Sequence, residues 1–217
     1  CRPCHHRRMW FFYTVILGMA FGRVLQELAV TVRDWRHGTR RPFAPAVLWQ
    51  AFLLASIVQV WLAVRYAVHT DEISVLGLLA FLAVPSGILV MSFLLPQSDL
   101  DPQHDPEAAF GRVRPVFFGV LIGTVVINLI HSFVIGQRGL DFDLLFQCLL
   151  AAGGLTGLLL RRTRADIALA VGMTLVVCVY IGLGYSTVEV GGPGAAAGVS
   201  GLEGSHSPDT SRPFATA

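Results

Sequence analysis

Residues 75–95 read VLGLLAFLAVPSGILVMSFLL, a run without a single charged side chain. A helix needs roughly 20 residues to cross the hydrocarbon core of a bilayer, so this run is long enough. It is apolar on every side, whereas a strand of a membrane barrel alternates apolar and polar residues. In lipid, a helix also satisfies each backbone N–H within its own segment. The run therefore predicts a transmembrane helix.

The rest of the chain has the same character. Of its 217 residues, 54% are hydrophobic and 14% are charged, whereas soluble domains carry roughly 25% charged residues. The charges fall in short clusters between apolar stretches, which predicts an all-α, polytopic protein with six transmembrane helices and the lipid bilayer as its main partner. The expected spans are residues 10–32, 45–67, 73–95, 115–135, 141–160 and 166–186.

Two segments lie outside these spans. Residues 187–217 are rich in Gly, Ser and Pro, which predicts a disordered tail. Residues 1–9 are expected to form a short extension, of which residues 1–8 are untranslated if synthesis starts at Met9. The extension contains CRPCH (1–5), the pattern of c-type haem attachment. Almost no chain surrounds it to build a haem pocket or a zinc site, so we expect no cofactor and no metal.

Arginine supplies all sixteen basic side chains and sets the expected orientation. By the positive-inside rule, the loops rich in arginine face the cytoplasm, which places both termini outside. The absence of Lys is typical of a GC-rich genome and favours a bacterial cytoplasmic membrane. A net charge of +2 without a continuous basic stripe predicts no nucleic-acid partner. The first, third and fifth loops hold Arg33, Arg36, Arg40, Arg41, Arg112, Arg114, Arg161, Arg162 and Arg164.

Polar side chains interrupt the first and fourth spans. In the first span two of them follow the first by three and four positions, and in the fourth span successive ones are four and three positions apart, so each set lies on one face of a helix. Ionisable groups inside a membrane cost about 2.5 to 3.5 kcal/mol, and they usually point inward and find partners. We therefore expect the two faces to form one interior polar cluster. Its members are Arg23, Gln26 and Glu27 of the first span and Thr124, Asn128 and His131 of the fourth.

Three interpretations of this cluster stay open. In the first, Arg23 and Glu27 form an ion pair across one helical turn and fix packing, as in a structural or accessory membrane protein. In the second, the cluster lines the pathway of a transporter or channel subunit for an unknown solute or ion. An alignment of residues 15–27 with 120–132 favours this interpretation, since inverted repeats are common among transporters. In the third, the cluster is catalytic, but the sequence lacks H-E-x-x-H, G-x-S-x-G and a pair of intramembrane carboxylates. We therefore expect no enzyme.

Three local features add detail. The acidic loop at 99–107 could hold a divalent cation, but it lacks the spacing of an EF-hand loop, so a solvated loop is favoured. The small residues of AAGGLTG (151–157) predict a face where helices pack closely. Pro85 interrupts the third span and predicts either a packed kink or a hinge. A homo-oligomer or a partner membrane protein is compatible with all three features.

The run LLP (94–96), the acidic residues after it, Phe110 and RVRPVFF (112–118) resemble a group of uncharacterised bacterial integral membrane proteins. LWQAFLLASIVQVW (48–61) is similar to the second span of that group. The resemblance covers about residues 10–135 and implies a polytopic helical architecture. It implies no activity and no functional residue.

The orientation predicts which fusions of alkaline phosphatase are active, since this enzyme folds only in an oxidising compartment. We expect activity when it is fused after Tyr185 and none when it is fused after Arg40 or Arg162. The measurement is phosphatase activity in intact cells at matched expression. The reverse pattern would show that Arg7 and Arg8 dominate the orientation and hold the first end inside.

Overall fold

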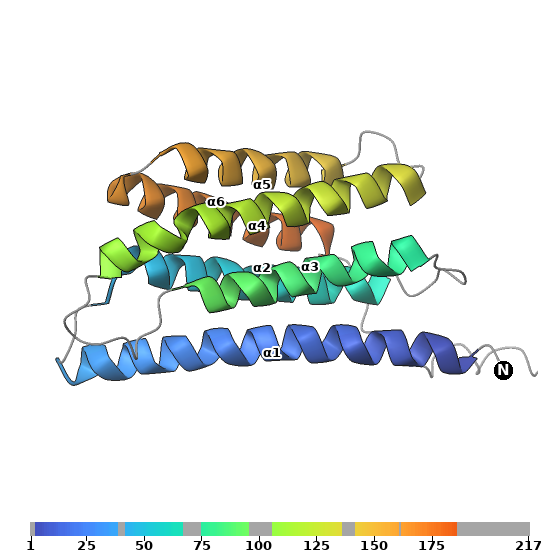
Figure 1. Cartoon of the computed structure of the whole chain (residues 1–217), viewed down its shortest axis with the longest axis horizontal. Coiled ribbons are helices and arrows are strands. Elements are labelled where there is room, and N and C mark those ends of the chain that lie inside the picture. Colours follow the sequence, from blue (N-terminus) through green and yellow to red (C-terminus); the bar gives the residue numbers. More distant parts are fainter. Residues whose placement is uncertain are drawn as a thin grey trace, which may run out of the picture. The chain divides into compact units, whose positions relative to one another are not determined.

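The computed structural model describes residues 3–38, 42–66, 75–95, 106–135, 142–160 and 162–185. Within these ranges the chain is all-α, with six helices and no strand (Figure 1). Each helix is long and apolar enough to cross a membrane, which confirms the predicted class of a six-span, multi-pass protein. The helices are α1 (Pro3–Arg36), α2 (Ala44–Tyr66), α3 (Val75–Leu94), α4 (Pro106–Ile135), α5 (Phe142–Leu159) and α6 (Thr163–Gly184).

Some predictions fall outside the described part of the chain. The expected tail at residues 187–217 is not described, nor are residues 96–105, which hold most of the acidic loop. The side chains of residues 1–10 and 131–135 are not described either, which leaves out the CRPCH motif and the His131 imidazole.

The start of α4 corrects the predicted boundary of the fourth span. We expected this span to open at Pro115, but α4 begins at Pro106 and contains Pro115 in its interior. Proline is well suited to the first position of a helix, where its missing N–H costs nothing. The carboxylate of Glu107 in the first turn also complements the positive end of the helix dipole. Arg112 and Arg114, expected in a loop, therefore lie on a helix.

Other arginines that were expected in loops also lie in the terminal turns of helices. Arg33 and Arg36 lie in the last turn of α1, which runs past the expected end at residue 32. Positive charge is favourable there because it faces the negative end of the helix dipole. Likewise α6 begins at Thr163, so Arg164 belongs to its first turn. Helices α1, α4 and α6 therefore run beyond the predicted apolar spans and include arginines that were expected in loops.

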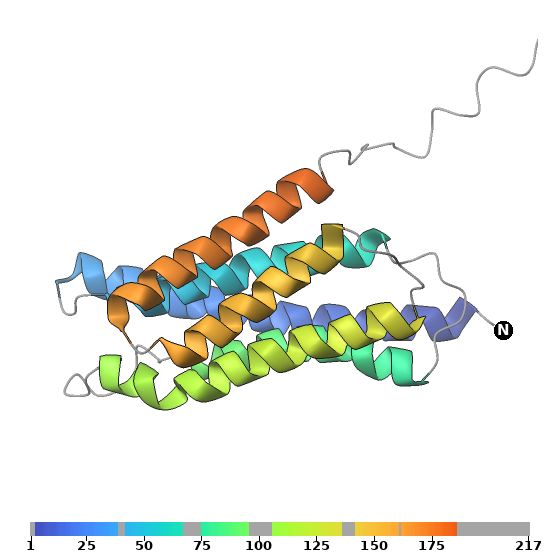
Figure 2. The ribbon, with the colours of Figure 1, turned by 90° about the horizontal axis from the view of Figure 1, so that it is seen from above.

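Five of the helices form a closed ring. Neighbouring pairs in the ring are α2 and α3, α3 and α4, α4 and α5, and α5 and α6, and α6 packs back on α2. Helix α1 lies outside the ring and packs on α2 and α3 (Figures 1 and 2). Successive helices run in opposite directions, so α1, α3 and α5 end at the edge of the bundle where α2, α4 and α6 begin. We call this edge the odd-loop end.

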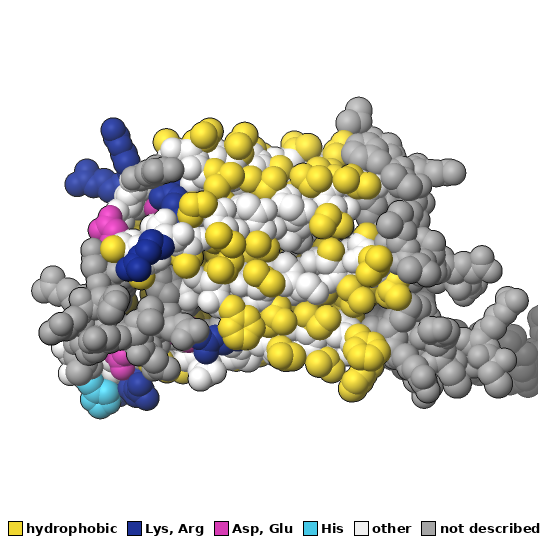
Figure 3. All heavy atoms as spheres, viewed as in Figure 1, with side chains coloured by type: hydrophobic (Ala, Val, Ile, Leu, Met, Phe, Trp, Pro, Cys, Tyr) yellow, Lys and Arg dark blue, Asp and Glu magenta, His cyan; other side chains and the backbone are white. Residues whose placement is uncertain are grey.

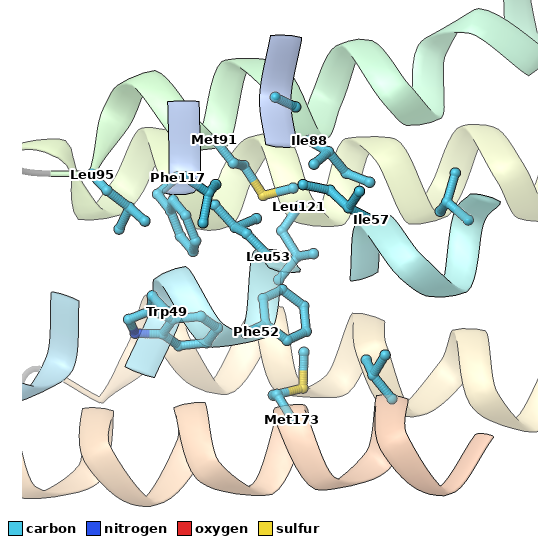
Figure 4. Close-up of a cluster of buried hydrophobic side chains, with 14 of the residues drawn as sticks. Trp49, Phe52, Leu53, Ile57, Ile88, Met91, Leu95, Phe117, Leu121 and Met173 are labelled. Atoms are coloured by element: carbon cyan, nitrogen blue, oxygen red, sulfur yellow. The ribbon is translucent and has the colours of Figure 1, made fainter. Parts of the chain in front are cut away.

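Aromatic side chains fill the inside of the ring. The ring of Trp49 lies edge-on to those of Phe52, Phe117 and Phe118, with centroid separations of 5.4, 5.3 and 5.1 Å. These four side chains are at most 1% exposed, and they join α2 to α4 across the ring. Figure 4 shows Met173 of α6 pointing toward Phe52 from the other side. Edge-to-face contacts of this kind stabilise beyond the area they bury, so the interior is a packed core.

The outer surface is apolar. Exposed side chains include Phe11, Leu159 and Leu183, at 66%, 74% and 65%. Figure 3 shows hydrophobic side chains across the middle of the face in view and Arg side chains at the odd-loop end. Soluble monomers rarely expose so much continuous apolar surface. Lipid is the solvent that fits this surface, in agreement with a membrane protein.

Glycines of α5 let the neighbouring helices come close, as the AAGGLTG motif predicts. Gly153, Gly154 and Gly157 are all buried. A Cβ at Gly154 would lie 2.8 Å from Ile122 of α4, and a Cβ at Gly157 would overlap the ring of Phe118. The predicted packing face is therefore confirmed, and it joins α5 mainly to α4.

We expect Gly157→Ala to lower the free energy of unfolding by about 1 to 3 kcal/mol, because the new methyl group meets a fully buried ring that has no room to move. The matched control is Gly172→Ala on α6, where a Cβ meets nothing within 4 Å. There the change should be neutral or stabilise by up to about 1 kcal/mol through helix propensity. Unfolding in mixed micelles with increasing dodecyl sulfate measures both. Equal effects at the two sites would contradict the tight packing at Gly157.

Candidate functional site

The most deeply buried ion pair in the described structure joins α4 to α6 at the odd-loop end. Nη1 of Arg114 donates a hydrogen bond to Oδ2 of Asp166 at 2.8 Å, and Nη2 lies 2.7 Å from Oδ1. The first contact is a charge-assisted hydrogen bond, and the second is a close contact between opposite charges without hydrogen-bond geometry. Arg114 is 8% exposed and Asp166 is 4% exposed. The pair is therefore almost fully removed from solvent within the protein itself.

The same guanidinium also holds the end of α5. Nε of Arg114 donates to the carbonyl oxygen of Gly157 at 2.9 Å, and Nη2 donates to the carbonyl oxygen of Leu160. The last carbonyls of a helix have no partner within the helix and need one from elsewhere. The guanidinium carbon also lies 5.6 Å from the centroid of the Phe118 ring. A single side chain of α4 thus caps α5 and fixes the first turn of α6.

A cavity of about 470 Å³ lies beside this ion pair. Across it, the hydroxyl of Thr163 donates a hydrogen bond to Oε1 of Glu107, which links α6 to the first turn of α4. The guanidinium of Arg114 in the cavity wall is already engaged by Asp166 and by two carbonyl oxygens of α5. The lining of the cavity consists of Phe43, Glu107, Phe110, Gly111, Arg114, Pro115, Leu158, Thr163 and Asp166.

The predicted pair on α1 is present. Nη2 of Arg23 lies 2.7 Å from Oε1 of Glu27, one helical turn away, with side chains that are 16% and 5% exposed. The guanidinium carbon of Arg23 lies 5.5 Å from the ring centroid of Phe93. Phe93 is the second-last residue of α3, so the Arg23–Glu27 pair lies near the odd-loop end of the bundle. A long side chain can reach water there.

The third polar residue of α1 faces the other way. Gln26 is exposed, whereas its neighbour Glu27 is buried. Successive residues of a helix are about 100° apart, so the expected polar face of α1 is wide enough for one edge to turn outward. The prediction that the whole face points into the bundle is therefore wrong for Gln26.

Thr124 and Asn128 on α4 do not meet the polar residues of α1. Helices α1 and α4 do not form a packed pair in the described structure, because α3 packs on both and lies between them. Thr124 packs against α3 instead, where a Cβ at Gly87 would overlap its hydroxyl oxygen. Asn128 is half-buried on the same helix. Among the described side chains, Arg23 and Thr124 thus make separate contacts with α3 in place of the expected single cluster.

A second polar contact ties α5 to α6 at the opposite end. The hydroxyl of Tyr180 donates to Oδ1 of Asp143 at 2.7 Å, and Nε2 of Gln147 donates to Oδ2 at 2.9 Å. The Tyr180 ring also stacks on Phe146, with centroids 4.0 Å apart. Helices α5 and α6 are thus joined by polar side chains near both of their ends.

No group of three His, Cys, Asp or Glu side chains in the described part of the chain is placed to hold a metal ion. The pairing of Arg114 with Asp166 was not predicted, because Arg114 was expected in a loop. The available signal was Asp166 itself, an acidic residue at the start of an apolar span, on the side of the membrane where arginines gather. A carboxylate placed there needs a cation nearby.

We expect Arg114→Met to lower the free energy of unfolding by about 3 to 5 kcal/mol, because it leaves the Asp166 carboxylate buried without its partner. Arg114→Lys should also destabilise, since one ammonium group cannot reach all three acceptors in this geometry. The double variant Arg114→Met, Asp166→Leu should lose less than the two single changes added together. Denaturant titration in mixed micelles measures each value.

Arg112→Met is the matched control. Arg112 lies on the same helix, is exposed, and bonds the carbonyl oxygen of Ala108 within its own helix. Its removal should change the free energy of unfolding by at most about 0.5 kcal/mol. Additive effects of the Arg114 and Asp166 changes would show that the two side chains are not coupled.

No protein-family model, curated protein or solved structure matches this chain. The chemistry of the site therefore rests on the geometry of its own residues.

Proposed function

We propose that this chain is a structural or accessory protein of a bacterial cytoplasmic membrane, with its odd-numbered loops in the cytoplasm and both termini outside. It is not an enzyme in this proposal. The observation that carries the proposal is the closed ring of α2 to α6, whose interior is filled by aromatic side chains that are at most 1% exposed. A protein that conducts or carries a solute needs polar groups along a path through its centre.

The use of the charged side chains supports the same role. The guanidinium of Arg114 binds Asp166 and two carbonyl oxygens of α5, so its charge stabilises the contacts between helices. Arg23 and Glu27 neutralise each other on α1. Structural pairing of this kind fixes helix positions and leaves no free charge to bind a solute.

A pathway between α1 and α4 has little support. The two helices do not pack as a pair, and Thr124 is occupied by its contact with Gly87 of α3. The arginine distribution supports the orientation, because six arginines lie at the helix ends of the odd-loop end, against Arg7, Arg8 and Arg65 at the opposite end of α1 and α2. The six are Arg33, Arg36, Arg112, Arg114, Arg162 and Arg164.

The test is flux through the purified protein in lipid vesicles. We expect the leakage of protons, sodium, potassium and small solutes, each driven by an imposed gradient, to equal that of vesicles without protein. The variants to compare are Glu27→Gln and Asn128→Leu. The matched control is Ser56→Ala, which removes a half-buried hydroxyl that bonds only the Phe52 carbonyl of its own helix. In our proposal the variants change stability and leave the flux at the background level.

A transporter would give a different pattern. It would show a flux that saturates with substrate, and Glu27→Gln or Asn128→Leu would abolish this flux while the protein stayed folded and inserted. Ser56→Ala would leave it unchanged. That result would overturn the structural role.

A further inference from the structure

Two exposed arginines at the start of α6 have no partner in the part of the chain that the structure describes. Arg162 occupies the N-cap position of α6, and Arg164 lies in its first turn. Neither forms an ion pair or a side-chain hydrogen bond with another described residue. Arg114, by contrast, is bound by Asp166 and by two carbonyl oxygens of α5. The charges of Arg162 and Arg164 therefore remain available to a group outside the chain.

The backbone and the neighbouring side chains leave this place positive. The first turn of an α-helix is the positive end of its dipole, and its N–H groups have no partner within the helix. Here the Arg162 side chain makes no capping hydrogen bond, and the hydroxyl of Thr163 donates to Glu107 of α4. The carboxylate of Asp166 is neutralised by Arg114. Glu107 thus offsets one of the two exposed arginines, and the dipole adds to the other.

The side of α6 that continues from Arg164 is apolar and exposed. Ala168, Val171 and Leu175 follow Arg164 at intervals of four, three and four residues, so all of them lie on one side of the helix. A Cβ at the neighbouring Gly172 would meet nothing within 4 Å. Leu175 is about 16 Å from Arg164 along the helix axis, which is roughly half the thickness of the hydrocarbon core of a bilayer. A chain the length of one lipid leaflet can therefore lie along this side.

We propose that the start of α6 binds the phosphate of an anionic phospholipid, with an acyl chain of this lipid along Val171 and Leu175. Guanidinium groups bind phosphate through charge-assisted hydrogen bonds, and the N-terminus of a helix also attracts anions. Basic side chains at the ends of transmembrane helices attract anionic lipids to that side of the membrane. This lipid site goes beyond the structural role proposed above and does not depend on it.

The surroundings favour a lipid over a soluble anion. A free anion would contact the charged groups and leave the apolar side of α6 uncovered. Leu159 and Leu160, which precede Arg162 in the chain, are also exposed, at 74% and 45%. A ligand with a negative charge at one end and a long apolar part matches both the arginines and the leucines beside them.

The end of α1 offers an internal comparison with the same charge. Arg33 and Arg36 lie in its last turn at the odd-loop end, and both are exposed. Arg33 already has a partner, since its Nε lies 3.4 Å from Oδ1 of Asp34. The last turn of a helix is also the negative end of its dipole. If the arginines act through overall charge alone, the two pairs are equivalent, so replacement of Arg33 and Arg36 is a charge-matched control.

The test counts lipids bound to the full chain by native mass spectrometry, in micelles with increasing phosphatidylglycerol or phosphatidylcholine. The dissociation constant should be at least about tenfold lower for phosphatidylglycerol, the anionic lipid. Arg162→Gln together with Arg164→Gln should raise this constant by a factor on the order of ten. Arg33→Gln together with Arg36→Gln should leave it within about twofold. Binding of phosphatidylcholine should change little in either double variant.

Inorganic phosphate, added at constant ionic strength, separates the lipid from a soluble anion. It should not displace bound phosphatidylglycerol, and displacement would identify a site for free anions and overturn the proposal. Equal dissociation constants for the two lipids would also overturn it, as would equal losses of affinity in the two double variants.

The α6 variants should fold, because both side chains are exposed and bond no other described residue. Unfolding in mixed micelles checks this for each variant. A second double variant, Arg162→Lys with Arg164→Lys, keeps both charges and should bind phosphatidylglycerol within about threefold of the unchanged protein. A loss in this variant as large as that in the Gln variant would contradict the electrostatic basis of the site.

Discussion

The guanidinium of Arg114 is the contact on which the odd-loop end of the bundle depends. Its N–H groups reach the Asp166 carboxylate and the carbonyl oxygens of Gly157 and Leu160, so they bring together α4, the end of α5 and the start of α6. Without water in the bilayer core, polar groups must find partners inside the protein. The short turn between α5 and α6 is therefore held by a single side chain from a third helix.

The class of fold follows from the sequence alone because it depends on one strong physical effect. Apolar runs long enough to cross a bilayer become helices in lipid. The predicted spans match most of the observed helix ends to within a few residues, and the main exceptions are the starts of α1 and α4. The AAGGLTG motif also predicted its packing role, because small residues are the means by which membrane helices approach. The start of α4 was missed because proline is tolerated both at the first position of a helix and, at a cost, inside one.

The candidate site was harder to predict, because it depends on which helices are neighbours. The Arg23–Glu27 pair could be inferred, since both partners lie on one helix and its geometry places them together. Arg114 and Asp166 are far apart in the chain, and only the closed ring brings α4 and α6 to opposite sides of the α5 end. The polar faces of α1 and α4 shared a pattern, but a pattern on two helices carries no information about the helix that lies between them.

The closure of the ring by α6 on α2 has a consequence for the order of assembly. The ribosome makes the chain from α1 onward, and α6 is the last of the six helices to leave it. Until it inserts, the side of α2 that it covers faces lipid, and Arg114 has no carboxylate from Asp166 to bind. A chain that has inserted only α1 to α5 therefore lacks the helix that covers α2 and the carboxylate that pairs with Arg114. The last helix thus supplies both the cover of the core and the counter-charge of the buried arginine.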